Sequence, residues 1–118
     1  MDQRHTRIVG KERHIWDTQR LWEASSGLPK TKVSIESIPE VDINCWFESR
    51  EPTLRAIAGH AVRIATADLS YPIILNDCGE LMDGGHRICK ALSLGHSTIL
   101  AVRFSQTPEP DESVDLDA

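Results

Sequence analysis

The segment YPIILNDCGELMDGGHRICKALSLG, residues 71–95, decides the fold of this chain. It opens with a compact apolar run, residues 71–76, which predicts a buried strand. Asp77-Cys78-Gly79 predicts the turn of a hairpin that leads into residues 80–82. A helix is then expected from Gly84 to a cap at Gly95. Its apolar members recur at helical spacing and are Ile88, Ala91, Leu92 and Leu94.

The rest of the chain supplies the elements that would pack around this segment. Residues 14–25 predict a helix, and residues 30–38 alternate between apolar and polar side chains as a half-buried strand does. Residues 52–68 predict a second helix, and residues 98–104 predict a last strand. The intervening loop, residues 40–51, contains Trp46-Phe47, which would either close a pocket or plug the core. We therefore expect an α+β domain with a small mixed sheet and packed helices.

Length and composition indicate an ordinary globular domain. The 118 residues are 40% hydrophobic and 26% charged, which suits one domain with a modest core. No apolar run approaches the roughly 18 residues of a membrane span, and the polar, basic N-terminus does not look like a secretory signal. The cysteines number three, with no metal-knuckle spacing, and indicate free thiols in a reducing compartment. A cytoplasmic location and no membrane partner are expected.

Charge divides the chain into a neutral domain and an acidic end. Residues 107–118 hold five of the 18 acidic residues and no Lys or Arg, so the remainder balances at 13 acids and 13 bases. We expect a flexible N-terminus at residues 1–13, a single domain at residues 14–106 and a disordered tail at residues 107–118. Because DNA binding depends on a basic surface, direct DNA binding is not expected. A homo-oligomer is compatible with the sequence.

The turn Asp83-Gly84-Gly85-His86-Arg87 suits a phosphorylated ligand. Glycines let a ligand approach the backbone, and the first N–H groups of a helix attract anions. Arg87 adds a cationic fork and His86 a switchable donor, while Asp83 would act as general base, Mg²⁺ ligand or hydroxyl acceptor. A purely structural interpretation is also open: Asp83 would cap the helix, and Arg87 would pair with Asp83 or Glu80.

The same stretch resembles the ParB/sulfiredoxin superfamily. The resemblance spans about 70 residues. Its motifs in this chain are Tyr71-Pro72-Ile73-Ile74-Leu75, Gly79 to Arg87, Lys90-Ala91, Leu94-Gly95 and Ile99-Leu100-Ala101-Val102, with Val33 to Ile38 similar to the first strand of the family. It implies a small mixed sheet with packed helices.

The branches of this superfamily imply different roles for the turn. The CTP-binding box of the partition proteins, Gly-Glu-Arg-Arg, falls on Gly84 to Arg87, with glycine and histidine in place of Glu and the first Arg. The catalytic cysteine of sulfiredoxin falls on Gly85, so sulfiredoxin chemistry is not expected. The Asp-Gly-x-His-Arg box of the free amino-acid kinases matches Asp83, His86 and Arg87. That branch also implies an acidic residue after the first strand, here Glu40 with Glu36 as its rival.

The sequence thus predicts a ParB-like domain that binds the phosphates of a nucleotide through Gly84, Gly85, His86 and Arg87. Catalysis by Asp83, Glu40 and His86 would be Mg²⁺-dependent phosphoryl transfer or nucleotide hydrolysis, with ATP, CTP or a diphosphate as ligand. No separate protein metal site is predicted. The alternative is a non-enzymatic regulatory or protein-interaction module, and a ParB-like nuclease is a third option.

Overall fold

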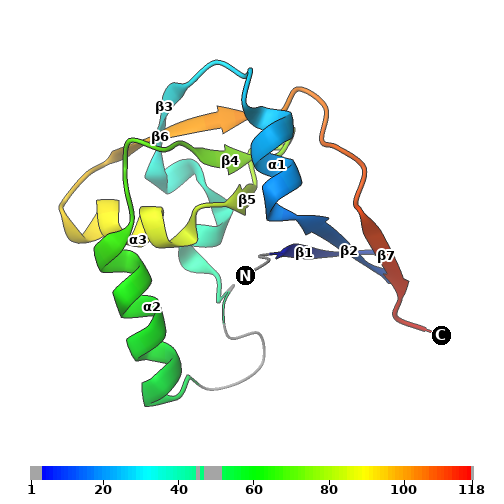
Figure 1. Cartoon of the computed structure of the whole chain (residues 1–118), viewed down its shortest axis with the longest axis horizontal. Helices are drawn as coiled ribbons and strands as arrows, with labels where there is room; N and C mark the ends of the chain where they lie inside the picture. The colour runs from blue at the N-terminus through cyan, green and yellow to red at the C-terminus, as the bar shows by residue number, and fades with distance from the viewer. Residues whose placement is uncertain (1–3, 45, 47–51, 118) are drawn as a thin grey trace.

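The computed structural model describes residues 4–44, 46 and 52–117, and within these residues the chain folds into two small sheets and three helices (Figure 1). The loop aromatic Phe47 and the cysteine Cys45 lie outside the described residues. The strands are β1 (Arg4–Val9), β2 (Glu12–Asp17), β3 (Thr31–Ser34), β4 (Ile73–Leu75), β5 (Leu81–Asp83), β6 (Thr98–Arg103) and β7 (Glu112–Asp115). The helices are α1 (Thr18–Ser25), α2 (Leu54–Thr66) and α3 (Gly85–Ser93), with two short 3₁₀ turns, η1 (Ile35–Ser37) and η2 (Pro39–Asp42).

The larger sheet is mixed and has the strand order β3-β6-β4-β5. β4 runs parallel to β6, with Ile73 opposite Ala101, whereas β3 and β5 run antiparallel to their neighbours. The hairpin between β4 and β5 closes through Asn76, whose side-chain oxygen accepts from the N–H groups of Cys78 and Glu80. The α+β class, the mixed sheet and this hairpin are as the sequence predicts.

Apolar side chains fill both faces of this sheet because its strands alternate their side chains between the two faces. One face packs against α3 and the 3₁₀ turns, and the other packs against α1 and the end of β2. The first cluster contains Ile35, Ile38, Ile73, Leu75, Leu81, Ile88, Ala91, Ile99 and Ala101. The second contains Trp16, Leu21, Ile74, Met82, Val102 and Phe104.

Local capping fixes the ends of the helices. The Asp17 side chain accepts from the N–H of Gln19 at the start of α1, and Thr53 accepts from the N–H of Ala56 at the start of α2. α3 ends in a Schellman motif. There the N–H of His96 donates to the carbonyl of Ala91 and Gly95 has φ +80°. The predicted glycine cap is therefore confirmed.

The smaller sheet corrects the prediction of loose ends. β2 lies between β1 and β7 in the order β1-β2-β7, with six residue pairs to β1 and four to β7. The prediction of a flexible N-terminus is therefore wrong for Arg4–Val9, and that of a disordered tail is wrong for Glu112–Asp115. The sequence pattern does not indicate either strand because both are rich in polar and charged residues. An edge strand pairs its backbone with a single neighbour and can keep such side chains in water.

Two element boundaries also differ from the sequence prediction. The helix predicted for residues 14–25 begins only at Thr18, because residues 14–17 complete β2 before Asp17 caps α1. The strand predicted for residues 30–38 ends at Ser34, where the chain turns into η1. Ile35 and Ile38 are nevertheless buried, since the 3₁₀ spacing of three residues points both into the core.

α2 projects away from the sheets and packs mainly beside α3 (Figure 1). None of its 13 residues is buried, although its apolar residues recur at helical spacing. In the described part of the chain, no helix has the length and apolar character needed to cross a bilayer.

Candidate functional site

The turn between β5 and α3 requires glycine at its centre. Gly84 has φ +119°, a left-handed conformation that side chains rarely tolerate. A Cβ built there would lie 2.4 Å from Cγ2 of Ile73 and 3.0 Å from a guanidinium nitrogen of Arg87. The turn is therefore pressed against β4, and its shape depends on the absence of a side chain.

The helix that follows starts without a side-chain cap. Gly84 occupies the N-cap position of α3, and in the described residues no side chain accepts from the first N–H groups. Gly85 lies against Trp46, since a Cβ at Gly85 would meet the indole ring at 3.2–3.5 Å. The uncapped N–H groups carry a partial positive charge that favours an anion.

Asp83 and Arg87 form a partly buried pair on this turn. Arg87 Nη2 lies 3.4 Å from Oδ2 of Asp83, and Nη1 donates to the carbonyl of Pro72 at 3.0 Å. The Asp83 Oδ2 also accepts from the indole N–H of Trp22 at 2.7 Å. The two charged side chains are only 15% and 17% exposed. The Oδ1 of Asp83 takes no hydrogen bond from the described residues.

His86 belongs to an aromatic stack that joins α2 to α3. Its Nε2 lies 2.8 Å from Nδ1 of His60, and both rings stack with Trp46 at centroid distances of 4.6 and 4.0 Å. Burial is the largest cause of the lowered pKa of His86, and the charges of His60 and then Arg63 lower it further. Burial and then Arg63 also lower the pKa of His60. The neutral pair is thereby favoured, with one ring donating to the other.

Glu40 lies at the start of η2 and faces the N-terminal hairpin. Its Oε1 accepts from the N–H of Leu81 at 2.9 Å, and its Oε2 from Arg7 at 3.2 Å. Arg7 also donates to Glu80 at 2.8 Å. Glu40 is 13% exposed, so both oxygens of a nearly buried carboxylate already hold protein donors.

His5 reaches the same region from β1. Its Nε2 is buried and has no hydrogen-bond partner among the described residues, and its ring lies 5.6 Å from that of Trp16. Burial is the main reason that its pKa falls from 6.5 to about 4, and Arg7 lowers it further. The charges of Glu40, Asp83 and Glu80 partly oppose this lowering of the His5 pKa.

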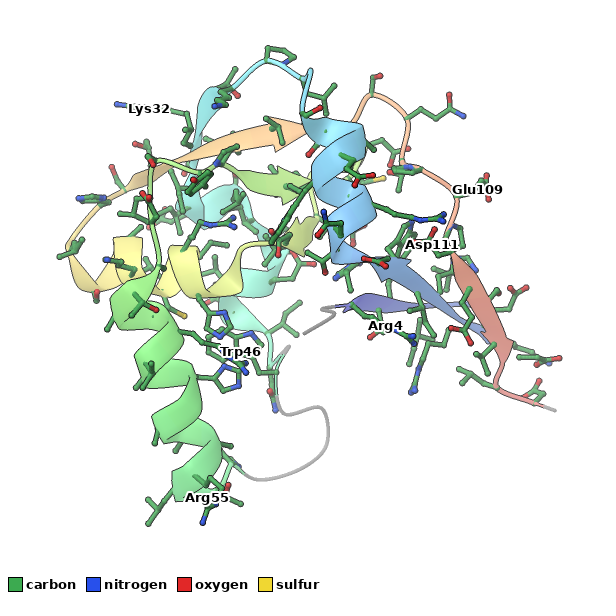
Figure 2. The ribbon with its side chains drawn as sticks, viewed as in Figure 1. Arg4, Lys32, Trp46, Arg55, Glu109 and Asp111 are labelled. Carbon is green, nitrogen blue, oxygen red and sulfur yellow. The ribbon has the colours of Figure 1, made fainter. Side chains whose placement is uncertain are left out.

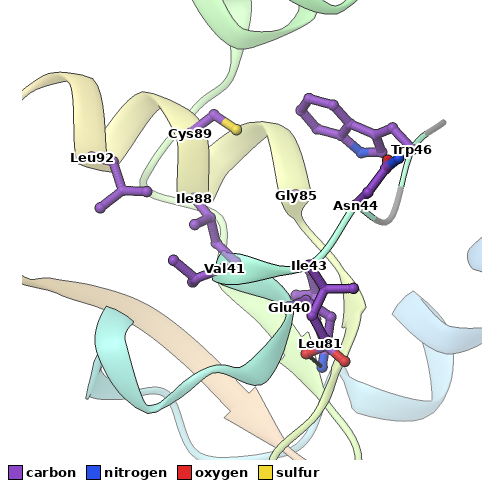
Figure 3. A pocket seen from close by; sticks show the side chains of 10 residues that line it. All are labelled: Glu40, Val41, Ile43, Asn44, Trp46, Leu81, Gly85, Ile88, Cys89 and Leu92. Atoms are coloured by element: carbon purple, nitrogen blue, oxygen red, sulfur yellow. Dashed lines mark hydrogen bonds between the residues drawn. The ribbon is translucent and has the colours of Figure 1, made fainter. Parts of the chain in front are cut away.

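An apolar groove of about 290 Å³ opens beside the first turn of α3 (Figure 3). Trp46 and Asn44 stand at one end of it and Leu92 at the other, while Gly85 forms part of its wall. The other lining residues are Glu40, Val41, Ile43, Leu81, Ile88 and Cys89. An apolar or aromatic group of modest size would therefore fit next to the anion-attracting helix end.

The predicted site residues are brought to two neighbouring places. Asp83 to Arg87 form one continuous turn. Glu40 lines another part of the same groove and accepts a hydrogen bond from Arg7. Glu36, the rival to Glu40, is exposed on η1. Among the described residues, no group of three or more His, Cys, Asp or Glu side chains is placed to hold a metal ion.

Sequence reasoning missed three partners of these residues. The sequence pattern assigns His60 to the polar flank of its helix and predicts a solvated side chain, yet in the structure His60 is half-buried and pairs with His86. The sequence signal for an inward-facing His60 is its spacing: it lies four residues after Ala56 and four before Ile64. Both of these residues are half-buried in the structure. Trp22 and Arg7 reach Asp83 and Glu40 from 61 and 33 residues away. Contacts at that separation have no local sequence signal.

A comparison of the sequence and the structure with known protein families, curated proteins and solved structures found no match.

Proposed function

We propose that the protein binds a phosphorylated ligand, in first place a nucleotide, at the turn Asp83 to Arg87. One observation carries this proposal: the left-handed Gly84 leaves the N-terminus of α3 without a side-chain cap, directly beside the apolar groove. Helix N-termini with close backbone access bind phosphate in many proteins. The likeness of this turn to the ParB/sulfiredoxin box supports the same ligand class.

His86 and Arg87 would complete the phosphate site. A phosphate dianion favours protonation of His86, because it stabilises the imidazolium that burial otherwise disfavours. Arg87 lies 3.4 Å from Asp83, a long contact that a phosphate oxygen could replace. Its shorter bond to the carbonyl of Pro72 would keep the guanidinium in position. Binding is therefore expected to strengthen as the pH falls through the pKa of His86.

The groove would hold the other part of the ligand. Its walls are largely apolar, and the Trp46 ring stands at the mouth next to Gly85. A nucleobase or another flat apolar group could enter there while its phosphates remain at the helix end. The position of Trp46 supports the interpretation of this residue as a pocket wall.

A binding module without turnover is favoured over an enzyme by the state of Glu40. Both Glu40 oxygens accept hydrogen bonds from protein donors, so this carboxylate is poorly placed to take a substrate proton. Phosphoryl transfer remains a second proposal because of Asp83, whose Oδ1 is not engaged by the described residues. Mg²⁺ commonly uses one or two carboxylates plus phosphate oxygens, so Asp83 with a bound nucleotide fits that ion.

Amide chemical shifts provide the direct test of binding. ATP, ADP, CTP and GTP are titrated, with and without Mg²⁺, into ¹⁵N-labelled protein. We expect the largest shifts at the N–H groups of Gly85, His86 and Arg87, accompanied by a rise in melting temperature. His86→Ala should weaken the shifts, whereas His96→Ala, at an exposed position beyond α3, should not. Shifts centred elsewhere, or none with any nucleotide, would refute the proposal.

Turnover is tested on the same samples. Release of inorganic phosphate, followed with and without Mg²⁺ and candidate hydroxyl acceptors, separates an enzyme from a binding module. Asp83→Asn keeps the bond to Trp22 while removing the base. For wild type, we expect nucleotide binding without release of inorganic phosphate. Release that disappears in Asp83→Asn would establish the catalytic alternative.

A further inference from the structure

α2 exposes a broad apolar surface on the side away from the body of the protein. This surface, the α2 arc, consists of Leu54, Ile57, Ala58, Ala61, Val62 and Ala65, which recur at intervals of three and four residues. Leu54, Ile57 and Val62 are 89%, 49% and 64% exposed. A contiguous exposed apolar row on a projecting helix is a common mark of an interaction site.

The α2 arc is distinct from the face that holds α2 to the protein. Ala56, His60 and Ile64 are half-buried and lie on the inward side of the helix. The end of α2 is fixed by Lys90, whose Nζ donates to the carbonyls of Ala65 and Ala67 at 3.1 and 2.7 Å. Since the anchoring uses another side of the helix, covering the arc would not require α2 to detach.

Charge restricts what can cover the arc. Residues 52–67 contain Arg55 and Arg63 and no acidic residue, whereas the whole chain carries a net charge of −5. The excess negative charge comes from residues 107–118, so two copies can bring their α2 helices together without opposing carboxylates. Arg55 stands at the N-terminal end of α2 (Figure 2) and has no ion-pair partner among the described residues.

We propose that the α2 arc binds the same arc of a second copy, with the two helices antiparallel and crossing at Ala61. A two-fold axis at this residue makes the contact self-complementary. The small Ala58, Ala61 and Ala65 allow close approach, and Ile57 of each copy lies opposite Ala65 of the other.

The register also brings opposite charges together at the two ends of the contact. It places Arg55 at the tip of one helix beside Asp68 at the root of the other. Asp68 is exposed and follows the end of α2, so it can form this ion pair.

The size of the contact predicts a weak dimer. Thirteen residues at 1.5 Å rise give a contact about 20 Å long. Such a contact buries less than the roughly 800 Å² per partner found in stable complexes. The dimer is therefore expected to dissociate in the micromolar range or above and to depend on protein concentration.

Sedimentation equilibrium over about 5 µM to 1 mM full-length protein tests this proposal. Wild type should pass from monomer to dimer, and Ala61→Glu should remain monomeric because two carboxylates would meet at the axis. Gly59→Glu is the matched control: it adds the same charge to the same helix, at a position with open space outside the arc. This control should associate as wild type does. A helical circular dichroism spectrum and a melting temperature no lower than that of wild type verify that each variant is folded.

A charge exchange tests the antiparallel register. Arg55→Glu and Asp68→Lys should each weaken association, because each places like charges at both ends of the homodimer. Mixing the two variants should restore dimers, since the two introduced side chains then face each other at one end and the native pair of Arg55 and Asp68 forms at the other. A wild type that stays monomeric, an Ala61→Glu variant that dimerises fully, or a mixture that shows no recovery would each overturn the proposal.

Discussion

At the scale of single residues, the conformation of Gly84 controls the candidate site. Its positive φ turns the chain from β5 into α3, and its missing side chain lets Ile73 and Arg87 pack against the backbone. The sequence suggests a glycine turn here, since the chain passes directly from a strand to a helix. It could not reveal that Ile73, eleven positions earlier, is the residue in contact, because that contact arises only when β4 and β5 pair.

Substitution of Gly84 should therefore cost more than loss of backbone freedom alone. Gly84→Ala combines a strained left-handed conformation with a clash against Ile73, and we expect it to lower the free energy of unfolding by about 3 kcal/mol. Gly59→Ala is the matched change within α2, where a Cβ meets open space, and should stabilise the protein by about 0.5–1 kcal/mol. Urea unfolding of both variants measures the difference. Equal effects would show that the Gly84 turn carries no strain.

His5 should make stability depend on pH in a defined direction. Burial and Arg7 hold its pKa at about 4, so the folded protein keeps the ring neutral where the unfolded chain binds a proton, below about pH 6.5. Its contribution to stability is complete above pH 6.5 and declines as the pH falls towards 4. His5→Gln should remove this part of the decline. Unfolding curves at several pH values, with an NMR titration of the imidazole, provide the measurement. A ring that titrates near 6.5 in the folded protein would contradict the assignment.

At the scale of elements, the sequence predicts segments with a strong local pattern and misses those held by distant partners. α3 follows from Ile88 and Ala91 at helical spacing and from the Gly95 cap, and its bounds agree closely with the prediction. β1 carries Arg4 and Arg7 and has no apolar alternation, so only its pairing with β2 makes it a strand. The site follows the same rule: the turn that begins at Asp83 is local, whereas its partners from α1, α2 and β1 enter through tertiary packing.

We expect the ion pairs of Arg7 to hold β1 against the larger sheet. It bridges Glu40 and Glu80 in a largely buried setting, and its removal would leave two carboxylates without their cation. Arg7→Met should therefore lower the free energy of unfolding by about 2–3 kcal/mol. Arg4→Met, on the same strand, loses only an exposed pair with Glu112 and should change stability by about 0.5 kcal/mol or less. Chemical denaturation of the two variants compares them directly, and similar losses would argue against the bridging role.

At the scale of the whole molecule, the two ends of the chain complete one sheet around β2. Trp16 on β2 donates its indole N–H to the carbonyl of Pro108 at 2.9 Å, and Asp111 accepts from Arg20 and from the N–H of Asp17. The acidic end is thus part of the folded structure through specific backbone and side-chain contacts. Composition alone could not show this, because five carboxylates without a nearby base are also typical of disordered tails.

Removal of residues 107–118 should test that role. The deletion takes away β7, the acceptor for Trp16 and the partner of Arg20, and we expect the melting temperature to fall by on the order of 10 °C. Tryptophan emission should also shift to longer wavelength as Trp16 gains contact with water. Deletion of residues 117–118 alone removes, among the described residues, an exposed ion pair with Lys11 and the hydrogen bond from the Asp117 N–H to Asp115, and should shift the transition by about 1–2 °C. If the protein without residues 107–118 has the same melting temperature as wild type, these residues contribute nothing to the stability of the fold.

The pairing of β2 with β7 also constrains the order of events during synthesis. Ile15 pairs with Glu112, so about a hundred residues separate two neighbours in one small sheet. β1 and β2 are synthesised before the other described strands, but their sheet stays incomplete until β7 has also left the ribosome. Closing so long a loop is entropically costly and slow compared with forming the β4–β5 hairpin. The candidate ligand turn is therefore expected to be in place early in folding, and the strands that join the two termini should be the last part to assemble.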